Sequence, residues 1–357
     1  MGKVCSFRKG YGISKDDLAT DGTPCILYGE LYTTYKTAIA KTIKSKTSIQ
    51  SKSLVYSKKD DVIIPCSGET AEDIATSICV PYDGVLLGGD LTIVHSDLDG
   101  AFLSNQINSV RKYDIARIAQ GKSIVHLQAD DLKKIFIFYP SIQEQRKISA
   151  FIDKIDKRIE IQNKIIEDLK VLKKELCKVI LNNKGWPKFR IRDIANLGRG
   201  RVINTDEINS QRSPIYPVYS SQTSNNGIMG YLDQYDFEGE YITWTTDGAN
   251  AGTVFYRNGR FNCTNVCGTL KLTVDFDYYI TALSIQMVTE KYVSKNLANP
   301  KLMNNVMAEI EIFIPDIQTQ KSLSSLFISL DKKIESAGEL LSCFVSEKKF
   351  LLNAIFI

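Results

Sequence analysis

The chain has 357 residues, of which 43% are apolar and 24% are charged, so it can form buried cores and shows no disordered bias. Its 45 Lys and Arg residues against 41 Asp and Glu residues give a net charge of +4, which by itself is too small to indicate a nucleic-acid partner. No apolar run approaches the roughly 18 residues of a membrane span, and residues 1–10 lack the apolar core of a signal peptide, so we expect a soluble cytoplasmic protein.

The first part of the chain, residues 1–141, has the pattern of an α+β globular module. Short β-branched runs such as 61–64 and glycine turns such as 82–84 predict strands. Residues 1–15 contain no acid and four basic residues: Lys3, Arg8, Lys9 and Lys15. A second basic cluster over 111–122 is interpreted as the surface of a helix.

A long helix is predicted over residues 142–183. Its apolar residues recur in steps of three and four, as in a coiled-coil seam, at positions 148, 152, 155, 159, 166, 169, 172, 176 and 179. Pro140 lies just before this helix, and Gly185 and Pro187 lie just after it. About 40 residues at 1.5 Å each give a rod of about 60 Å. Two ordinary core helices are the alternative interpretation of this helix and its later counterpart.

Residues 184–316 return to the pattern of a β-rich module. Strands are predicted at 241–244, 253–256 and 268–274, and a helix near 278–290. The segment 184–201 has one acidic residue, Asp193, and six basic residues: Lys184, Lys188, Arg190, Arg192, Arg199 and Arg201. A second long helix is predicted over 317–357, with seam positions at 323, 327, 330, 334, 341, 344 or 345, and 352.

An internal repeat organises these elements. Residues 135–160 align without a gap with residues 310–335, at a constant offset of 175, and 12 of the 26 positions are identical. At the other end, residues 4–18 align with 194–208 at an offset of 190. The sequence therefore predicts one fold twice, with domain boundaries at 1–141, 142–185, 186–316 and 317–357. We expect the two helices to pair antiparallel, with a module at each end.

The repeated basic segments favour nucleic-acid binding. Lys9 and Gly10 align with Arg199 and Gly200, and a glycine beside a cation lets both approach a phosphate closely. Loops over 28–36 and 219–227 differ between the copies and hold polar groups that can address base edges, although simple turns are the alternative. The candidate DNA-binding residues are Lys9, Tyr28, Glu30, Thr33, Tyr35, Lys36, Ser67, Arg199, Arg201, Ser220, Ser221, Gln222, Asn225, Thr246 and Asp247.

Motifs of catalysis and of cofactor binding are missing. The sequence has neither dinucleotide nor P-loop glycine motifs, and no adjacent prolines for an amino-methyltransferase loop. The eight cysteines are scattered, which favours reduced thiols, and only two histidines are present, so a metal site is not expected. Asp316, Asp331 and Lys333 imitate a nuclease pattern, but we reject it because they lie in a predicted helix and the other copy has Ser141 in place of Asp316.

With the repeat in hand, the chain resembles the specificity (S) subunits of type I restriction-modification enzymes. The resemblance is carried by the segments 140–148 and 315–323, each with the pattern P-x-I-x-x-Q, and by the long helix behind each of them. It implies two target recognition domains alternating with two helical regions in an antiparallel coiled coil. It also implies recognition of a bipartite double-stranded DNA target without catalysis or a cofactor, with the helices acting as a ruler.

The resemblance also implies protein partners. Modification subunits, two of them, would bind S-adenosylmethionine and dock on the helical regions, and restriction subunits, which translocate and cleave DNA, would join the larger complex; no membrane partner is expected. The chain departs from the family pattern at one place: the second copy has a lead-in segment, 185–191, that the first copy lacks. The first recognition domain is therefore expected to be trimmed. A coiled-coil scaffold with protein-binding ends and a self-contained DNA enzyme remain as alternatives.

Overall fold

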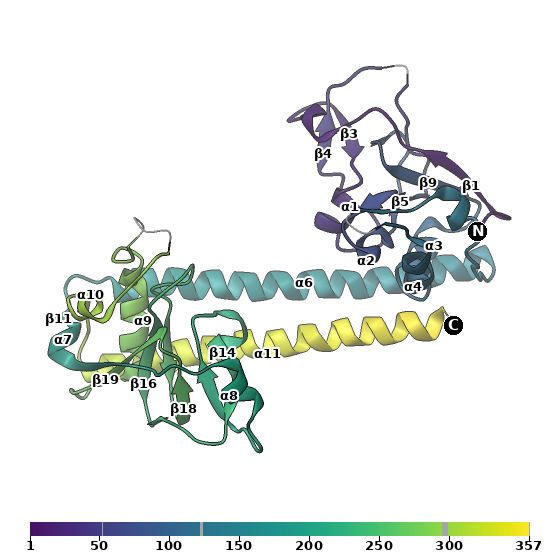
Figure 1. The fold of residues 1–357 in the computed structure, drawn as a ribbon. Helices are drawn as coiled ribbons and strands as arrows, with labels where there is room; N and C mark the ends of the chain where they lie inside the picture. The colour runs from purple at the N-terminus through teal and green to yellow at the C-terminus, as the bar shows by residue number, and fades with distance from the viewer. Residues whose placement is uncertain (52, 122–123, 295–298, 357) are drawn as a thin grey trace. The chain divides into compact units, whose positions relative to one another are not determined.

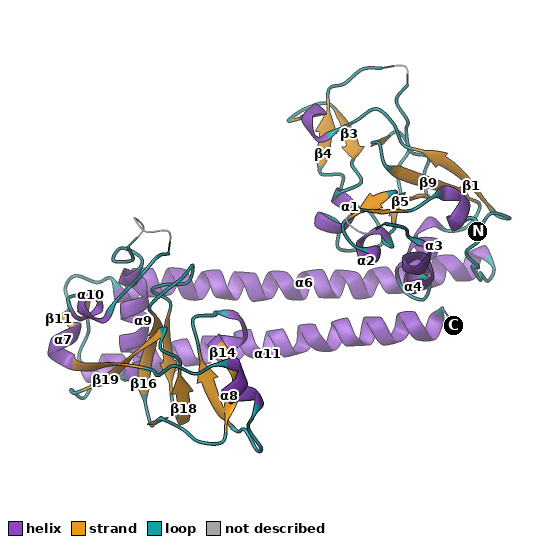
Figure 2. Cartoon of the chain, viewed as in Figure 1, coloured by secondary structure: helices purple, strands orange, loops and turns teal. Residues whose placement is uncertain are grey.

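The computed structural model describes the whole chain except residues 52, 122–123, 295–298 and 357. Its contacts divide the chain into two compact units, Met1–Lys164 with Glu339–Ile357, and Ile165–Gly338. Helices and strands occur in both units (Figure 2), which confirms the α+β class. Among the described residues, no helix is both long and apolar enough to cross a membrane.

The described residues of the first unit form sheets with the strand orders β1-β9-β5-β7, β2-β4-β3-β8 and β10-β6. Figure 1 labels β1, β5 and β9 of the first of these sheets and β3 and β4 of the second. Its strands are β1 (Cys5–Lys9), β2 (Leu18–Ala19), β3 (Thr23–Ile26), β4 (Ser45–Thr47), β5 (Asp61–Pro65), β6 (Ser67–Gly68), β7 (Ile78–Val80), β8 (Leu86–Leu87), β9 (Leu91–Ser96) and β10 (Val125–His126). Its short helices are η1 (Lys15–Asp17), α1 (Glu30–Thr33), α2 (Ala71–Ile74), α3 (Gly100–Asn108), α4 (Lys112–Ile118) and α5 (Ala129–Leu132).

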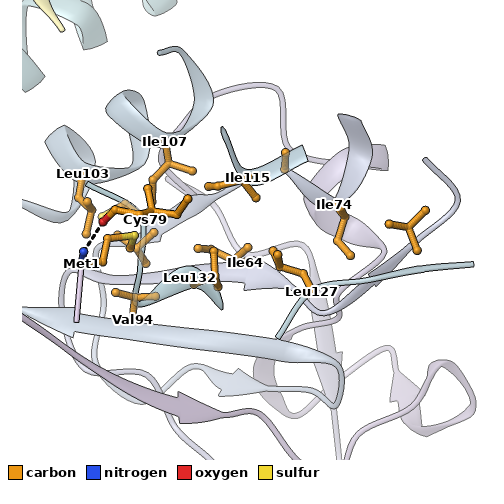
Figure 3. Close-up of a cluster of buried hydrophobic side chains, with 14 residues drawn as sticks. Met1, Ile64, Ile74, Cys79, Val94, Leu103, Ile107, Ile115, Leu127 and Leu132 are labelled. Atoms are coloured by element: carbon orange, nitrogen blue, oxygen red, sulfur yellow. Dashed lines mark hydrogen bonds between the residues drawn. The ribbon is translucent and has the colours of Figure 1, made fainter. Parts of the chain in front are cut away.

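Strand β5 shows why the apolar run at 61–64 forms the centre of a sheet. Ile64 joins a buried cluster that includes Leu103 of α3 (Figure 3). Ile63 joins a different cluster, which includes Ile26 of β3. Successive residues of a strand point to opposite faces, and both faces of β5 are covered, so the run 62–64 is apolar throughout. Asp61, at the start of the strand, is also buried, but its carboxylate pairs with Arg8 and His95.

The second unit contains sheets with the orders β12-β19-β16-β17, β14-β13-β18-β15 and β11-β20. Its strands are β11 (Lys188–Arg190), β12 (Ala195–Arg199), β13 (Tyr216–Tyr219), β14 (Ile228–Leu232), β15 (Phe237–Glu238), β16 (Tyr241–Thr245), β17 (Val254–Arg257), β18 (Arg260–Cys263), β19 (Cys267–Leu272) and β20 (Glu311–Phe313). Its short helices are α7 (Ile191–Ile194), α8 (Thr205–Asn209), η2 (Ser224–Gly227), α9 (Tyr278–Thr289) and α10 (Asn304–Ala308).

The first sheet of each unit has the same order and the same register. Cys5 pairs with Ser96 at one end of β1·β9, as Ala195 pairs with Leu272 in β12·β19. In both sheets a third antiparallel strand, β5 or β16, lies on the other side of the central strand. The expectation of one fold twice is therefore confirmed.

The two aligned glycines are required by close packing within each module. A side chain at Gly10 would place its Cβ atom 2.0 Å from the carbonyl oxygen of Gly88, and one at Gly200 would lie 2.2 Å from the carbonyl oxygen of Cys263. Both positions therefore require glycine for close approach within the module. This packing accounts for both glycines within the fold, and the approach of a phosphate beside them stays a prediction.

The lead-in segment of the second copy forms β11, which pairs antiparallel with β20. Directly after it, the backbone amide of Ile191 donates a hydrogen bond of 3.1 Å to the carbonyl of Ile310. The amino group of Met1 donates to the carbonyl of Ile135 at the corresponding place (dashed line in Figure 3). Among the described residues of the first unit, no strand pairs with residues 136–138.

The two predicted long helices are α6 (Ile142–Leu181) and α11 (Ile317–Ile355). Ser141 and Glu144 form a reciprocal cap at the start of α6. Asp316 caps α11 through the backbone amide of Thr319, at 3.0 Å. Asp316 is thus a capping residue, which supports rejection of the nuclease pattern.

In the first unit, α6 and α11 pack antiparallel. Lys348 donates a hydrogen bond of 2.5 Å to Asp156, and the guanidinium of Arg158 lies 4.3 Å from the ring centre of Phe344. Positions that increase along α6 therefore meet positions that decrease along α11. The contact ends in an apolar cluster of Ile152, Phe356 and Phe102 of α3.

The second unit repeats this packing. Lys173 of α6 donates to both carboxylate oxygens of Asp331 of α11, at 2.6 and 2.7 Å. At the offset of 175, Asp331 corresponds to Asp156 and Lys348 corresponds to Lys173, so the two ion pairs are equivalent. The hydroxyl of Tyr279 also donates to Asp331.

The sequence-based seam is wrong at two positions. Leu172 is 47% exposed and Val179 is 77% exposed, whereas Lys173 pairs with Asp331 of α11 and Cys177 is buried in a cluster with Phe327 of α11. The spacing of apolar residues favoured Leu172, but the ion pair with Asp331 places Lys173 in the seam instead. Hydrophobic periodicity alone cannot detect this substitution of charge for apolar contact.

Candidate nucleic-acid interface

Three candidate residues of the second unit meet at the end of β12. The Nε atom of Arg199 donates a hydrogen bond of 2.7 Å to the carbonyl of Asn265. Its Nη2 atom donates a hydrogen bond of 2.9 Å to Oγ1 of Thr246. The same Nη2 atom lies 3.2 Å from Oδ2 of Asp247. Lys301 lies 3.5 Å from the other oxygen of Asp247, so this carboxylate sits between two cations. The cluster keeps one net positive charge at a half-exposed surface.

Different chemistry occupies the corresponding place of the first unit. Lys9 ends β1 as Arg199 ends β12, and it lines a hollow with Ser67, Asp90 and His126. The hydroxyl of Ser67 donates 3.3 Å to Oδ2 of Asp90 and lies 3.3 Å from Nδ1 of His126. Here Lys9, a hydroxyl, an imidazole and the carboxylate of Asp90 stand where the second unit has two cations around the carboxylate of Asp247.

The correspondence between these two places follows from strand pairing. His126 of β10 pairs antiparallel with Ser67 of β6, and Lys301 forms an antiparallel bridge with Asp247. At the offset of 175, His126 corresponds to Lys301. His126, Lys301 and Asp90 are not among the sequence-based candidates, because their positions next to those residues depend on pairing between segments that are distant in the chain.

The loop at 28–36 contributes to a second hollow of the first unit. Tyr28, Glu30 and Thr33 line it, together with Lys15 and Asp90. Since Asp90 lines both hollows, the two adjoin each other. Five of the candidates of this unit therefore gather in one region.

Several groups of that loop are already used by the fold. The carboxylate of Glu30 accepts hydrogen bonds from the amide of Leu27 at 2.8 Å and from the hydroxyl of Ser45 at 2.6 Å. Tyr35 packs against a buried cluster, and burial raises its pKa to about 12. Lys36 is exposed but lines neither of the two hollows. Tyr35 thus has a core role in this structure.

The loop at 219–227 holds the other polar candidates of the second unit. The side-chain amide of Gln222 donates to the carbonyl of Ile228, so it closes the loop on itself. Asn225 has a positive φ of 48° and an exposed side chain. Asn250, three residues after Asp247, donates 3.3 Å to the carbonyl of Ser221, which joins the loop to the Arg199 cluster.

A buried arginine packs against the first residue of this loop. The guanidinium of Arg257 lies 3.5 Å from the ring centre of Tyr219 and 4.3 Å from that of Phe255. Burial lowers its pKa. A cation held between aromatic rings stiffens the base of the loop, whose outer residues include Ser220, Ser221 and Asn225.

The remaining basic residues of the segment 184–201 are mostly neutralised. Arg201 forms hydrogen bonds with Glu207 and Asp236 and holds the pKa of Glu207 below its usual value. Ion pairs also connect Lys188 and Arg190 with Glu311. The sequence indicated a free cationic patch here, but acids that are distant in the chain balance most of it.

The cluster at 111–122 is helical over Lys112–Ile118. Lys112 and Arg117 lie on α4, and Arg111 precedes it and pairs with Asp114 at 3.3 Å. Lys122 lies outside the described residues. This placement agrees with the interpretation of the cluster as a helix surface.

Comparison with known proteins gives the two modules a family. The profile of the type I restriction modification DNA specificity domain matches residues 1–171 and 183–341. A putative type I specificity subunit of Mycoplasma pneumoniae is 30% identical over 237 residues, which is 64% of this chain and 88% of that protein. The type I restriction enzyme MpnII specificity subunit of the same organism is 37% identical over 151 residues, covering 42% of this chain and 45% of that protein.

Solved structures show the same fold. The S subunit of a type I restriction-modification system from M. genitalium superposes with a TM-score of 0.66 at 16% identity, covering 100% of this chain and 94% of that chain. A chain from a structure on complex assembly and conformational transition of the type I system gives 0.62 at 13% identity, covering 99% and 96%. Because the family profile matches both copies over most of the sequence, the chain belongs to the type I restriction-modification DNA specificity family.

Proposed function

We propose that the chain reads a two-part double-stranded DNA target, one half-site with each recognition domain. The domains are residues 1–141 and 186–316, and the helical regions are 142–185 and 317–357. The proposal rests on one observation: the same strands in the same register present different chemistry at the same place. A common frame with different contact groups suits two similar readers of two different sequences.

Within each domain, the residues divide by what they can contact. Arg199 and Lys9 lie at equivalent strand ends and carry charge suited to phosphate oxygens. The loop residues Tyr28 and Asn225 are exposed and carry groups suited to base edges. Glu30, Tyr35, Gln222 and Arg201 are weaker candidates, because the fold already engages their polar groups or buries them.

Partners follow from the same family. We infer that modification subunits, which would bind S-adenosylmethionine, dock on the helical regions and that restriction subunits complete the complex. Exposed apolar residues recur on the helices at the offset of 175: Phe151 corresponds to Leu326, and Ile165 corresponds to Leu340. Two equivalent sets of exposed apolar side chains favour two modification subunits.

The alternatives are less well supported. Membership of a specificity family argues against a general scaffold whose ends bind proteins. It equally argues against a self-contained enzyme, because specificity subunits serve the methyltransferase and the endonuclease and do not catalyse. The chain itself is proposed to need no cofactor.

Exchange of one recognition domain tests the proposal. Residues 186–316 are replaced by the corresponding domain of another family member, and the methylated bases of a host carrying the modification subunit are mapped. We expect one half of the methylated sequence to change while the other half stays. Changes in both halves, or methylation by the purified chain alone, would contradict the proposal.

A further inference from the structure

A glutamine at the start of α6 joins the long helix to the recognition module of the first unit. Gln145 is only 2% exposed. Its side-chain oxygen accepts a hydrogen bond of 2.9 Å from the amide of Asp99, and its side-chain nitrogen donates 2.8 Å to the carbonyl of Pro140. Asp99 in turn caps α3 by accepting from the amide of Phe102 at 2.9 Å.

The second unit contains the same arrangement. Gln320 is 0% exposed. Its side-chain oxygen accepts a hydrogen bond of 2.7 Å from the backbone amide of Asp277, and its side-chain nitrogen donates a hydrogen bond of 2.8 Å to the carbonyl of Pro315. Asp277 caps α9 by accepting from the amide of Ile280 at 2.8 Å. Each glutamine therefore uses both ends of its amide to hold a capping turn of the module against the first turn of the long helix.

Further contacts surround this amide. The hydroxyl of Ser149, one turn along α6, donates 2.6 Å to the capping carboxylate of Asp99. Seven residues beyond each glutamine the long helix inserts an apolar side chain: Ile152 joins Phe102 of the module in one unit, and Phe327 joins Ile280 in the other. In the first unit the helix supplies isoleucine and the module supplies phenylalanine, and in the second unit the helix supplies phenylalanine and the module supplies isoleucine. The combined volume of the two side chains is therefore the same in both junctions.

We propose that Gln145 and Gln320 are positioning residues that fix the angle of each recognition domain on its long helix. They thereby limit the spacer lengths between half-sites that the complex accepts. This inference rests on the proposed function. It goes beyond it because neither side chain contacts DNA: both are buried in the junction and act through Asp99 or Asp277.

The amide chemistry suggests a sharp test, the substitutions Gln145→Glu and Gln320→Glu. A neutral glutamic acid can still accept from the Asp amide and donate to the Pro carbonyl, whereas an ionised one loses the donor and adds a charge beside the capping carboxylate. Burial raises the pKa of such a glutamic acid by up to several units. The variants should therefore behave like the wild type near about pH 6 and differ from it near about pH 9.

The experiment uses the complex of the full chain with its modification subunit. Methylation is measured on duplexes that keep both half-sites but have spacers one or two base pairs shorter or longer. At the higher pH, we expect the preference for the natural spacer to fall about tenfold in each variant, while preference for the half-site sequences stays. Gln143→Glu and Gln318→Glu are matched controls, because both residues are exposed in the first turn of the same helices. They should show no pH-dependent change of spacer preference.

Gln145→Met and Gln320→Met cover the case in which a buried charge prevents folding. Methionine fills similar space without either hydrogen bond, so spacer preference should relax at both pH values. A folded Met variant that keeps the natural spacer preference, or a general loss of half-site preference in its place, would overturn the positioning role. If the wild-type complex itself shows no half-site preference, the proposed function fails instead.

Discussion

The two equivalent ion pairs between α6 and α11 should differ in strength, because their surroundings differ. In the first unit Asp156 is 9% exposed at its side chain, whereas in the second unit Asp331 is 43% exposed. The lysines are similar, at 20% for Lys348 and 21% for Lys173. The perturbation is to replace each lysine in turn by methionine, which keeps an unbranched side chain one atom shorter and removes the charge.

The burial of the remaining carboxylate sets the magnitude. Breaking a buried pair costs about 3–5 kcal/mol, whereas breaking an exposed one costs about 0–1 kcal/mol. Lys348→Met should cost about 2–3 kcal/mol, since Asp156 is left nearly buried. Lys173→Met should cost about 1 kcal/mol, since Asp331 keeps the Tyr279 hydroxyl and access to water.

Urea unfolding followed by circular dichroism measures both values. A double substitution, Asp156→Leu with Lys348→Met, should recover most of the loss, because an apolar pair of similar volume tolerates burial better than one unpaired charge. Equal costs for the two lysines, or a larger cost for Lys173→Met, would refute the argument from burial. Failure of the double variant to recover stability would show that the contact geometry matters more than the charge.

Further outcomes follow from the candidate interface. Arg199→Ala should weaken binding to all DNA sequences and lower the slope of log affinity against log salt by about 1, whereas Arg201→Ala, whose guanidinium already holds two carboxylates, should leave that slope unchanged. Asn225→Ala should reduce discrimination at one base pair by about 1–3 kcal/mol, measured as relative affinity for single-base variants of the target. Above about pH 10, the stability of the wild type should fall as the unfolded chain releases the Tyr35 proton that the folded chain keeps, and Tyr35→Phe should flatten this fall in pH-dependent unfolding.

The sequence predicts the parts of the fold that depend on local pattern. Strand β5 and helix α9 lie where the β-branched run at 61–64 and the segment near 278–290 indicated them. The long helices also follow from local spacing of apolar residues. Each of these elements is specified by neighbours in the chain, so a repeat of the pattern predicts a repeat of the element.

What the sequence could not predict depends on distant partners. Whether Leu172 or Lys173 faces α11 is decided by Asp331, which lies more than 150 residues away in the chain. The charge of Arg201 is balanced by Glu207 of the nearby helix α8 and by Asp236, which lies 35 residues further along the chain. Composition gives the number of charges but not their pairing, so a basic segment overstates the charge that remains free.

The identities between the two copies separate two kinds of constraint. Gln145 and Gln320 make the same two hydrogen bonds in both units, and the equivalent Asp–Lys pairs close both halves of the helix contact. At the candidate interface the equivalent residues differ, with His126 in one copy and Lys301 in the other. A structural junction must satisfy the same geometry twice, so its side chains are kept. A surface that reads two sequences must differ, so the positions that break the repeat are the ones to examine for base recognition.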